Sequence, residues 1–185
     1  MSKQRENAKH RSKAYTLALM GMMFALAMVF SFVEGMLPAA PMLPPGVKLG
    51  LSNIVTMYAL LFLGVKEGYT IAVLKSLFVL LVRGPIGAAL SLAGGLASIT
   101  VMVLKATVAS LRQSKSLLSI AGAVFHNLGQ LLMSVVIIGN AWAFSYLPVM
   151  LLSGVGMGLV TGIMLRLIAP YLTRLNIGLN KNLYS

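Results

Sequence analysis

Lys75 is the residue whose position most demands a chemical explanation. It lies near the middle of an apolar stretch, about seven residues from either end, and a charge at the centre of a membrane-spanning helix costs at least ~2.5 kcal/mol. The chain has only three acidic residues and no aspartate, and the helix order below places only Glu34 on the outer side. Lys75 is therefore expected to pair with Glu34, to lose its charge, or to face an anionic ligand.

A second polar group falls inside a later apolar stretch, where His126, Asn127 and Gln130 lie close together in sequence. His126 and Gln130 are one helical turn apart and share a face, and polar side chains in hydrocarbon need partners. This face should therefore point into a helix bundle, either as an interhelical hydrogen-bond clamp or as a surface that recognises a solute. Asn53 is a similar candidate in an earlier stretch.

Two further cations, Lys48 and Arg83, flank apolar stretches on a side of the membrane that carries few other charges. Together with Lys75 they would give an outward-opening vestibule a positive potential, which favours an anionic solute. The alternative is that each cation anchors the protein to lipid headgroups.

The segment that leads to Lys48 contains Pro44, Pro45 and Gly46. Prolines at this density exclude a helix and favour a stiff, extended loop. With Glu34 at its start, this segment is expected to act either as a gate over the vestibule or as a plain connector.

The elements that must position these residues are membrane helices. Of the 185 residues, 58% are hydrophobic and only 10% are charged, and the mean hydropathy is +0.91, which is typical of a membrane protein. A bilayer core of about 30 Å needs roughly 20 apolar residues per helix. The apolar runs predict an all-α membrane protein with six transmembrane helices, at residues 14–33, 49–63, 69–82, 88–104, 117–138 and 146–172. The chain then divides into a basic tail over 1–13, one transmembrane domain over 14–172 and a C-terminal tail over 173–185.

The basic residues set the predicted orientation. The net charge is +12, and twelve of the fifteen basic residues fall on one side of the membrane if the N-terminus is cytoplasmic. Because lysine and arginine concentrate in cytoplasmic loops, both termini are expected inside. The location is then a bacterial cell membrane, whose anionic lipid the basic tail would contact. The charges form no basic folded face with interleaved aromatics, so nucleic acid is not expected as a partner.

Small residues recur at helical spacing on several of the predicted helices. Gly154, Gly158 and Gly162 stand four apart, which allows another helix to approach closely, and residues 87–98 carry a similar stripe. These two stripes are expected to pack within the bundle. Gly21 and Ala25 form a shorter stripe on the first helix, which either packs internally or docks a partner membrane subunit.

Several functions are disfavoured by residues that the sequence lacks. It has no G-x-x-x-x-G-K-[ST] phosphate loop, so any pumping needs a separate ATPase. Without cysteine or aspartate it has no thiolate centre and no paired aspartates for magnesium. The second histidine, His10, lies in the N-terminal tail, so no metal site is expected around His126. We therefore expect a protein that is not an enzyme and carries no cofactor.

Four runs of the sequence carry a resemblance to a known family. They are PPGVKLGLSNIVTMYAL at residues 44–60, SLAGGLAS at 91–98, HNLGQ at 126–130 and YLP at 146–148. Over about residues 14 to 172, the chain resembles the bacterial family called Gx transporter or heptaprenyl diphosphate synthase component I. That family is in turn similar to the substrate-binding S components of energy-coupling-factor (ECF) transporters.

The resemblance implies a six-helix protein that captures a small solute near the outer face. It also implies a transmembrane coupling subunit and two ATPase subunits as partners. S components often carry an A-x-x-x-A docking motif on the first helix, at the place where this chain has Gly21 and Ala25.

The leading hypothesis is a solute-binding component of an ECF-type importer for a small anionic or amphipathic molecule, such as a vitamin or an isoprenoid or quinone precursor. The expected solute-binding residues are Lys48, Asn53, Lys75, Arg83, His126, Asn127 and Gln130. The alternative is a non-catalytic membrane subunit that scaffolds an isoprenoid or quinone biosynthetic enzyme. A stand-alone facilitator is a third hypothesis.

Overall fold

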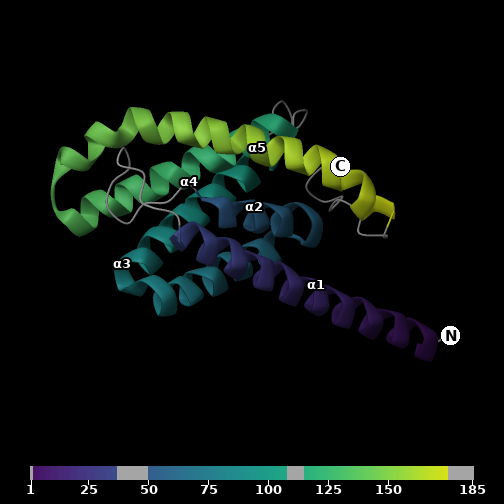
Figure 1. The fold of residues 1–185 in the computed structure, drawn as a ribbon. Coiled ribbons are helices and arrows are strands. Elements are labelled where there is room, and N and C mark those ends of the chain that lie inside the picture. The colour runs from purple at the N-terminus through teal and green to yellow at the C-terminus, as the bar shows by residue number, and fades with distance from the viewer. Residues whose placement is uncertain (1, 37–49, 108–114, 175–185) are drawn as a thin grey trace.

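The computed structural model describes residues 2–36, 50–107 and 115–174. In these ranges every regular element is a helix (Figure 1). The elements are α1 (Ser2–Met36), α2 (Leu51–Tyr58) with a π-helical continuation (Ala59–Leu63), α3 (Val65–Thr107), α4 (Lys115–Ile138), a 3-10 helix (Ala141–Tyr146) and α5 (Leu147–Arg174). The prediction of an all-helical protein is confirmed for this part of the chain. α1 begins at Ser2, so the residues expected to form a tail continue the first helix.

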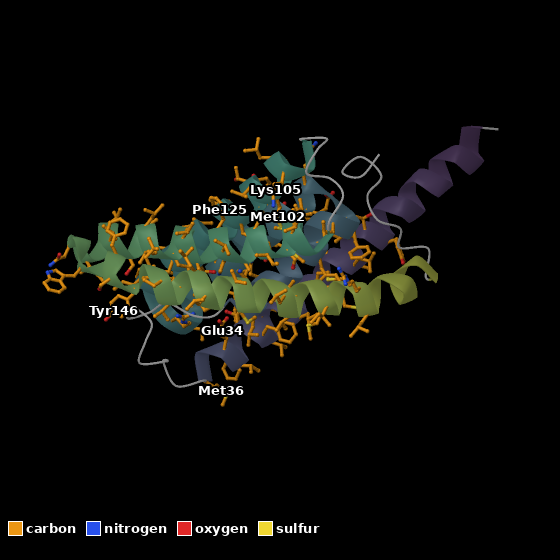
Figure 2. All side chains as sticks on the ribbon, turned by 90° about the horizontal axis from the view of Figure 1, so that it is seen from above. Glu34, Met36, Met102, Lys105, Phe125 and Tyr146 are labelled. Carbon is orange, nitrogen blue, oxygen red and sulfur yellow. The ribbon has the colours of Figure 1, made fainter. Side chains whose placement is uncertain are left out.

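Four helices are long and apolar enough to cross a membrane, and one shorter apolar helix accompanies them. The four are Ala14–Met36, Val65–Lys105, Leu117–Ile138 and Trp142–Met164, and the shorter one is Leu51–Leu63. Large apolar side chains also cover the outside of the bundle, where Figure 2 shows a carbon-rich layer. Leu17, Leu81, Val136 and Leu152 are each more than two-thirds exposed, as suits contact with lipid. The chain is therefore a multi-pass membrane protein.

α3 consists of two helical halves that fold back on each other. Its backbone leaves the helical conformation at Gly84, where φ is 75° and ψ is −175°. Tyr69 and Thr100 share a hydrogen bond of 2.8 Å. Nearer the break, Ser76 Oγ donates to Ser91 Oγ over 3.4 Å. Because the residue numbers rise in one half as they fall in the other, the two halves run antiparallel.

The reversal in α3 is tighter than the sequence predicts. We expected a connection over residues 83–87, whereas helical structure resumes directly after Gly84. A positive φ is accessible to glycine without steric cost. Pro85 suits the first position of the following helix, because its missing N–H would have no helical partner there.

α2 is the most enclosed helix. Every residue from Ser52 to Tyr58 is buried, and the π-helix that follows buries Ala59 to Phe62. α2 contacts α1, α3, α4 and α5, so its neighbours shelter this short helix. Polar residues at the start of α2 are therefore held inside the bundle.

The glycine stripe of α5 packs against α4, as the spacing predicts. A Cβ atom built on Gly154 would lie only 2.9 Å from Val124 Cα, and one on Gly158 would collide with Ile120 Cα. Two helix backbones can approach this closely only where the side chain is a hydrogen atom. The stripe therefore holds α4 in a fixed register beside α5.

Candidate functional site

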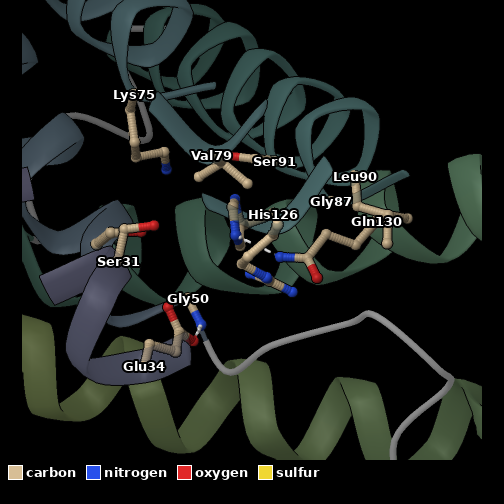
Figure 3. A pocket seen from close by; sticks show the side chains of 12 residues that line it. Ser31, Glu34, Gly50, Lys75, Val79, Gly87, Leu90, Ser91, His126 and Gln130 are labelled. Carbon is tan, nitrogen blue, oxygen red and sulfur yellow. Dashed lines mark hydrogen bonds between the residues drawn. The ribbon is translucent and has the colours of Figure 1, made fainter. Parts of the chain in front are cut away.

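A polar cavity lies where α1, α2, α3 and α4 meet (Figure 3). Its lining residues are Ser31, Glu34, Gly50, Ser52, Lys75, Val79, Arg83, Gly87, Leu90, Ser91, His126 and Gln130. The cavity measures about 20 Å³, which is room for about one water molecule. The sequence separation of these residues means that the cavity exists only once the helices have packed.

Lys75 supplies the least compensated charge of this cavity. It is 0% exposed, and among the described residues its Nζ has no hydrogen-bond partner. Lys75, Val79 and Arg83 follow one another at four-residue spacing on the first half of α3, so all three face the cavity. A buried ammonium without a hydrogen bond is costly, and its position in mid-helix keeps it from reaching the surface.

Glu34 is the only carboxylate among the described residues that line the cavity. It lies near the end of α1 and is only 4% exposed. Its Oε1 accepts a hydrogen bond of 2.5 Å from the backbone N–H of Gly50, which precedes α2. The carboxylate also lies within electrostatic range of both Lys75 and Arg83. Glu34 therefore joins α1 to α2 and offsets part of the positive charge from α3.

His126 is held in the wall of the cavity by two glycines and one amide. A Cβ atom on Gly50 would lie 2.8 Å from His126 Cδ2, and one on Gly94 would lie 2.8 Å from His126 Cε1. Gly50 also has a φ of 88°, which most other residues avoid. Gln130 Nε2 lies 2.6 Å from His126 Nε2, so with the amide as donor a neutral imidazole carries its proton on Nδ1. The interaction of His126 with Gln130 agrees with their predicted shared face.

The two asparagines predicted to bind solute are placed elsewhere. Asn127 Nδ2 donates to Met150 O at 2.8 Å and to Ser153 Oγ at 3.0 Å on α5, so it clamps α4 to α5. Asn53 Nδ2 donates to Ser98 Oγ at 3.1 Å. Asn53 lines a separate hollow of about 10 Å³, which shares His126 with the polar cavity.

The polar cavity thus brings together Lys75, Arg83, His126 and Gln130 from the predicted solute-binding set, with Glu34 from the predicted gate. The remaining predicted residues of these two groups, Lys48, Pro44, Pro45 and Gly46, lie outside the described residues.

The predicted docking residues Gly21 and Ala25 lie on an open face of α1. Both are exposed, and a Cβ atom on Gly21 would meet nothing within 4 Å. None of the described residues covers this face, so another molecule can contact it.

Three serines of the cavity were not predicted as part of it. Ser31 stands one helical turn before Glu34, and Ser91 follows Gly87 at four-residue spacing. Those spacings were available signals, because residues one turn apart share a helix face. Ser52 carried no comparable signal, since serine is common in membrane helices. Their hydroxyls can donate or accept hydrogen bonds without adding charge to the two cations and one carboxylate that the described residues contribute to the cavity.

An apolar hollow of about 170 Å³ lies between α1, α2 and α5. Its lining residues are Met23, Leu26, Phe30, Ile54, Val55, Tyr58 and Met164. α1 and α2 border both this hollow and the polar cavity. The polar cavity and the apolar hollow therefore lie against the same two helices. This arrangement suits the binding of a molecule with one polar and one apolar part.

Comparison with known protein families gives a match over most of the chain. The family model of heptaprenyl diphosphate synthase component I matches residues 23–168, a range that includes α2, α3, α4 and every residue that lines the polar cavity. Comparisons with curated proteins and with solved structures found no match. Because the matched range covers most of the 185 residues, the chain belongs to the heptaprenyl diphosphate synthase component I family.

Proposed function

We propose that this protein is the solute-binding membrane component of an importer, and that it holds a small anionic or amphipathic molecule in the polar cavity. The observation that carries the proposal is the complete burial of Lys75, which has no hydrogen-bond partner among the described residues, beside a second cation, Arg83. Ionisable residues inside a membrane are expensive and mark solute or ion pathways. An anionic group in the cavity would supply the partner that Lys75 does not find among the described side chains.

The cavity is too small to hold a solute in the arrangement described. A cavity of about 20 Å³ is far below the roughly 300 Å³ of the smallest usual ligand pockets. The described arrangement is therefore a closed form of the cavity in this proposal. Solute binding therefore requires this cavity, whose wall comes from α1, α2, α3 and α4, to widen around the solute.

The proposal includes six membrane crossings with both termini in the cytoplasm. The antiparallel halves of α3 contain roughly 20 residues each, enough for about 30 Å of helix. The two halves of α3 then count as two crossings, and Leu51–Leu63 counts as a short one. Together with α1, α4 and α5 they make six crossings. Lys66 and Lys105 lie together at the open end of the α3 hairpin, and the positive-inside rule assigns this end to the cytoplasm. The polar cavity then lies toward the outer face, near Gly84.

Energy for uptake would come from other subunits. The sequence contains no phosphate-binding loop, and its resemblance to S components suggests a transmembrane coupling subunit with two ATPases. The exposed face around Gly21 and Ala25 is the proposed contact with the coupling subunit. In this scheme the chain itself catalyses no reaction, and the membrane is that of a bacterial cell.

Native mass spectrometry of protein purified from its own membrane tests the proposal. The wild type should retain a small molecule, and Lys75→Met should lose it because the ammonium that binds its anionic group is gone. Lys66→Met is a matched control, since Lys66 is exposed on the same helix and should leave retention unchanged. Equal retention by all three proteins would remove Lys75 from the site.

The description of the family favours a second function, that of a non-catalytic membrane subunit which scaffolds an isoprenoid or quinone biosynthetic enzyme. The open face of α1 would then receive a synthase rather than a coupling subunit. Co-purification from native membrane separates the two functions, because ATPases and a coupling protein support the importer and a prenyl synthase supports the scaffold. A stand-alone facilitator would instead take up solute in liposomes without ATP.

A further inference from the structure

The balance of charges in the polar cavity gives information about the solute. Among the described residues, two cations, Lys75 and Arg83, line the cavity together with one carboxylate, Glu34. These three side chains together carry one net positive charge.

Glu34 is fixed in place independently of any solute. Its Oε1 accepts a hydrogen bond from the N–H of Gly50, and Glu34 is buried. This contact of Glu34 involves no solute, so the entry of an anion beside Lys75 does not have to break it. Glu34 therefore offsets one of the two positive charges whether or not the cavity is occupied.

The remaining charge belongs to a group that can still bind. Lys75 Nζ lies within electrostatic range of Glu34 but has no hydrogen-bond partner among the described residues. An ammonium has three donors, and Ser31 and Ser91 add hydroxyls to the same wall. One anionic group can thus bind to Lys75 without displacing Glu34.

We infer that Glu34 sets the charge specificity of the site and restricts it to solutes whose buried group carries a single negative charge, such as a carboxylate. The inference rests on the proposed solute-binding function. A group with two or more negative charges, such as a diphosphate, would leave excess negative charge next to Glu34 in a low-dielectric site, where like charges repel strongly. Removing the charge of Glu34 should therefore increase the preference of the cavity for anions.

The absence of cysteine from the sequence permits a direct test with one introduced thiol. Ser91→Cys places a thiol of nearly the same size in the cavity wall. Its modification rate is measured with methanethiosulfonates of three charges: the anionic sulfonatoethyl, the cationic trimethylammonioethyl and the neutral methyl reagent. The neutral reagent corrects each variant for opening of the cavity. Ser145→Cys, in the exposed 3-10 helix, is the control outside the cavity.

With Glu34 intact, the anionic reagent should modify Ser91→Cys about tenfold faster than the cationic one, at the low end of the rate effects of charged clefts. Glu34→Gln keeps the size of the side chain and an oxygen that can accept the Gly50 N–H. It should raise the ratio of anionic to cationic rates by roughly another tenfold. Glu34→Asp retains the charge and should leave the ratio close to that of the parent, and Ser145→Cys should show a ratio near that of the free thiol throughout.

The outcomes distinguish the role of Glu34 from the existence of the anionic site. A preference for the anionic reagent that Glu34→Gln does not change would overturn the role of Glu34 and leave the anionic site standing. A ratio at Ser91→Cys equal to that at Ser145→Cys would overturn the anionic site itself. An equal rise in Glu34→Asp and Glu34→Gln would show that packing, rather than charge, is responsible, and would also overturn the inference.

Discussion

Replacing Lys75 with methionine is expected to make the solute-free protein more stable, although the same change should abolish solute retention. Methionine has a similar length and is flexible enough to fill the same space. It removes a buried ammonium that has no hydrogen-bond partner among the described residues. Glu34 keeps the Gly50 N–H and still lies within electrostatic range of Arg83, so the carboxylate is not left without compensation.

The expected gain follows from the cost of burying charge. Replacing a complete buried ion pair by apolar residues of similar volume is often neutral or stabilises a protein by about 1–4 kcal/mol, whereas removing one partner of a pair destabilises it. Lys75→Met resembles the first case, because Glu34 keeps both the Gly50 N–H and the charge of Arg83. We take about 2 kcal/mol, because Glu34 already compensates part of the charge of Lys75 through space. For a chain of this size each kcal/mol moves the Tm by about 2–4 °C. Lys75→Met should therefore raise the Tm by about 4–8 °C.

The assay is thermal unfolding of detergent-purified protein, followed by circular dichroism of the helices after any retained solute has been removed. Lys66→Met serves as the control, because an exposed substitution should change stability by no more than about 0.5 kcal/mol. A Tm of Lys75→Met several degrees below the wild type would refute the reasoning. It would show that Lys75 and Glu34 form a structural ion pair, which is one of the alternatives predicted from the sequence.

Three further substitutions test how the site is built. Gly50→Ala should lower stability by at least about 1–2 kcal/mol, because alanine is strained at positive φ and its Cβ would lie 2.8 Å from His126 Cδ2; thermal unfolding measures the loss, and solute retention should fall with it. Asn127→Leu should lower stability by about 1–3 kcal/mol through lost hydrogen bonds to α5, while native mass spectrometry should show unchanged retention. Gly158→Val should destabilise the protein by about 1–3 kcal/mol or more through overpacking, because its side chain collides with Ile120; an unchanged Tm would contradict the close contact of α4 with α5.

The charged part of the site could be predicted because charge is rare in this chain. With three acids in 185 residues, the number of partners for a lysine in mid-helix was small, and Glu34 and Lys75 do line one cavity. The pairing of His126 with Gln130 followed from their spacing of four residues. These predictions needed only helical periodicity and the cost of burying polar groups.

The asparagines show where such reasoning stops. Asn127 follows His126 directly, and one residue along a helix turns the side chain by about 100°. The two side chains therefore face different neighbours, and Asn127 reaches Met150 O on α5. Which of two adjacent polar residues faces a cavity depends on the rotation of the whole helix, which tertiary packing determines.

The reversal in α3 has a similar explanation. The sequence marks a break near residues 83–87 through Gly84 and Pro85, but it does not give the length of the connection. The chain reverses at one residue, Gly84, whose positive φ is accessible to glycine without strain. The antiparallel contact of Ser76 with Ser91 then brings both halves of α3 to the same cavity.

An experimental structure of the protein purified with its retained solute, by crystallography or electron cryomicroscopy, tests the central claim most directly. The account predicts an anionic group in the cavity within about 3 Å of Lys75 Nζ, the distance of a charge-assisted hydrogen bond, with Glu34 still bound to the Gly50 N–H. A retained solute bound elsewhere, with Lys75 in direct contact with Glu34, would contradict it.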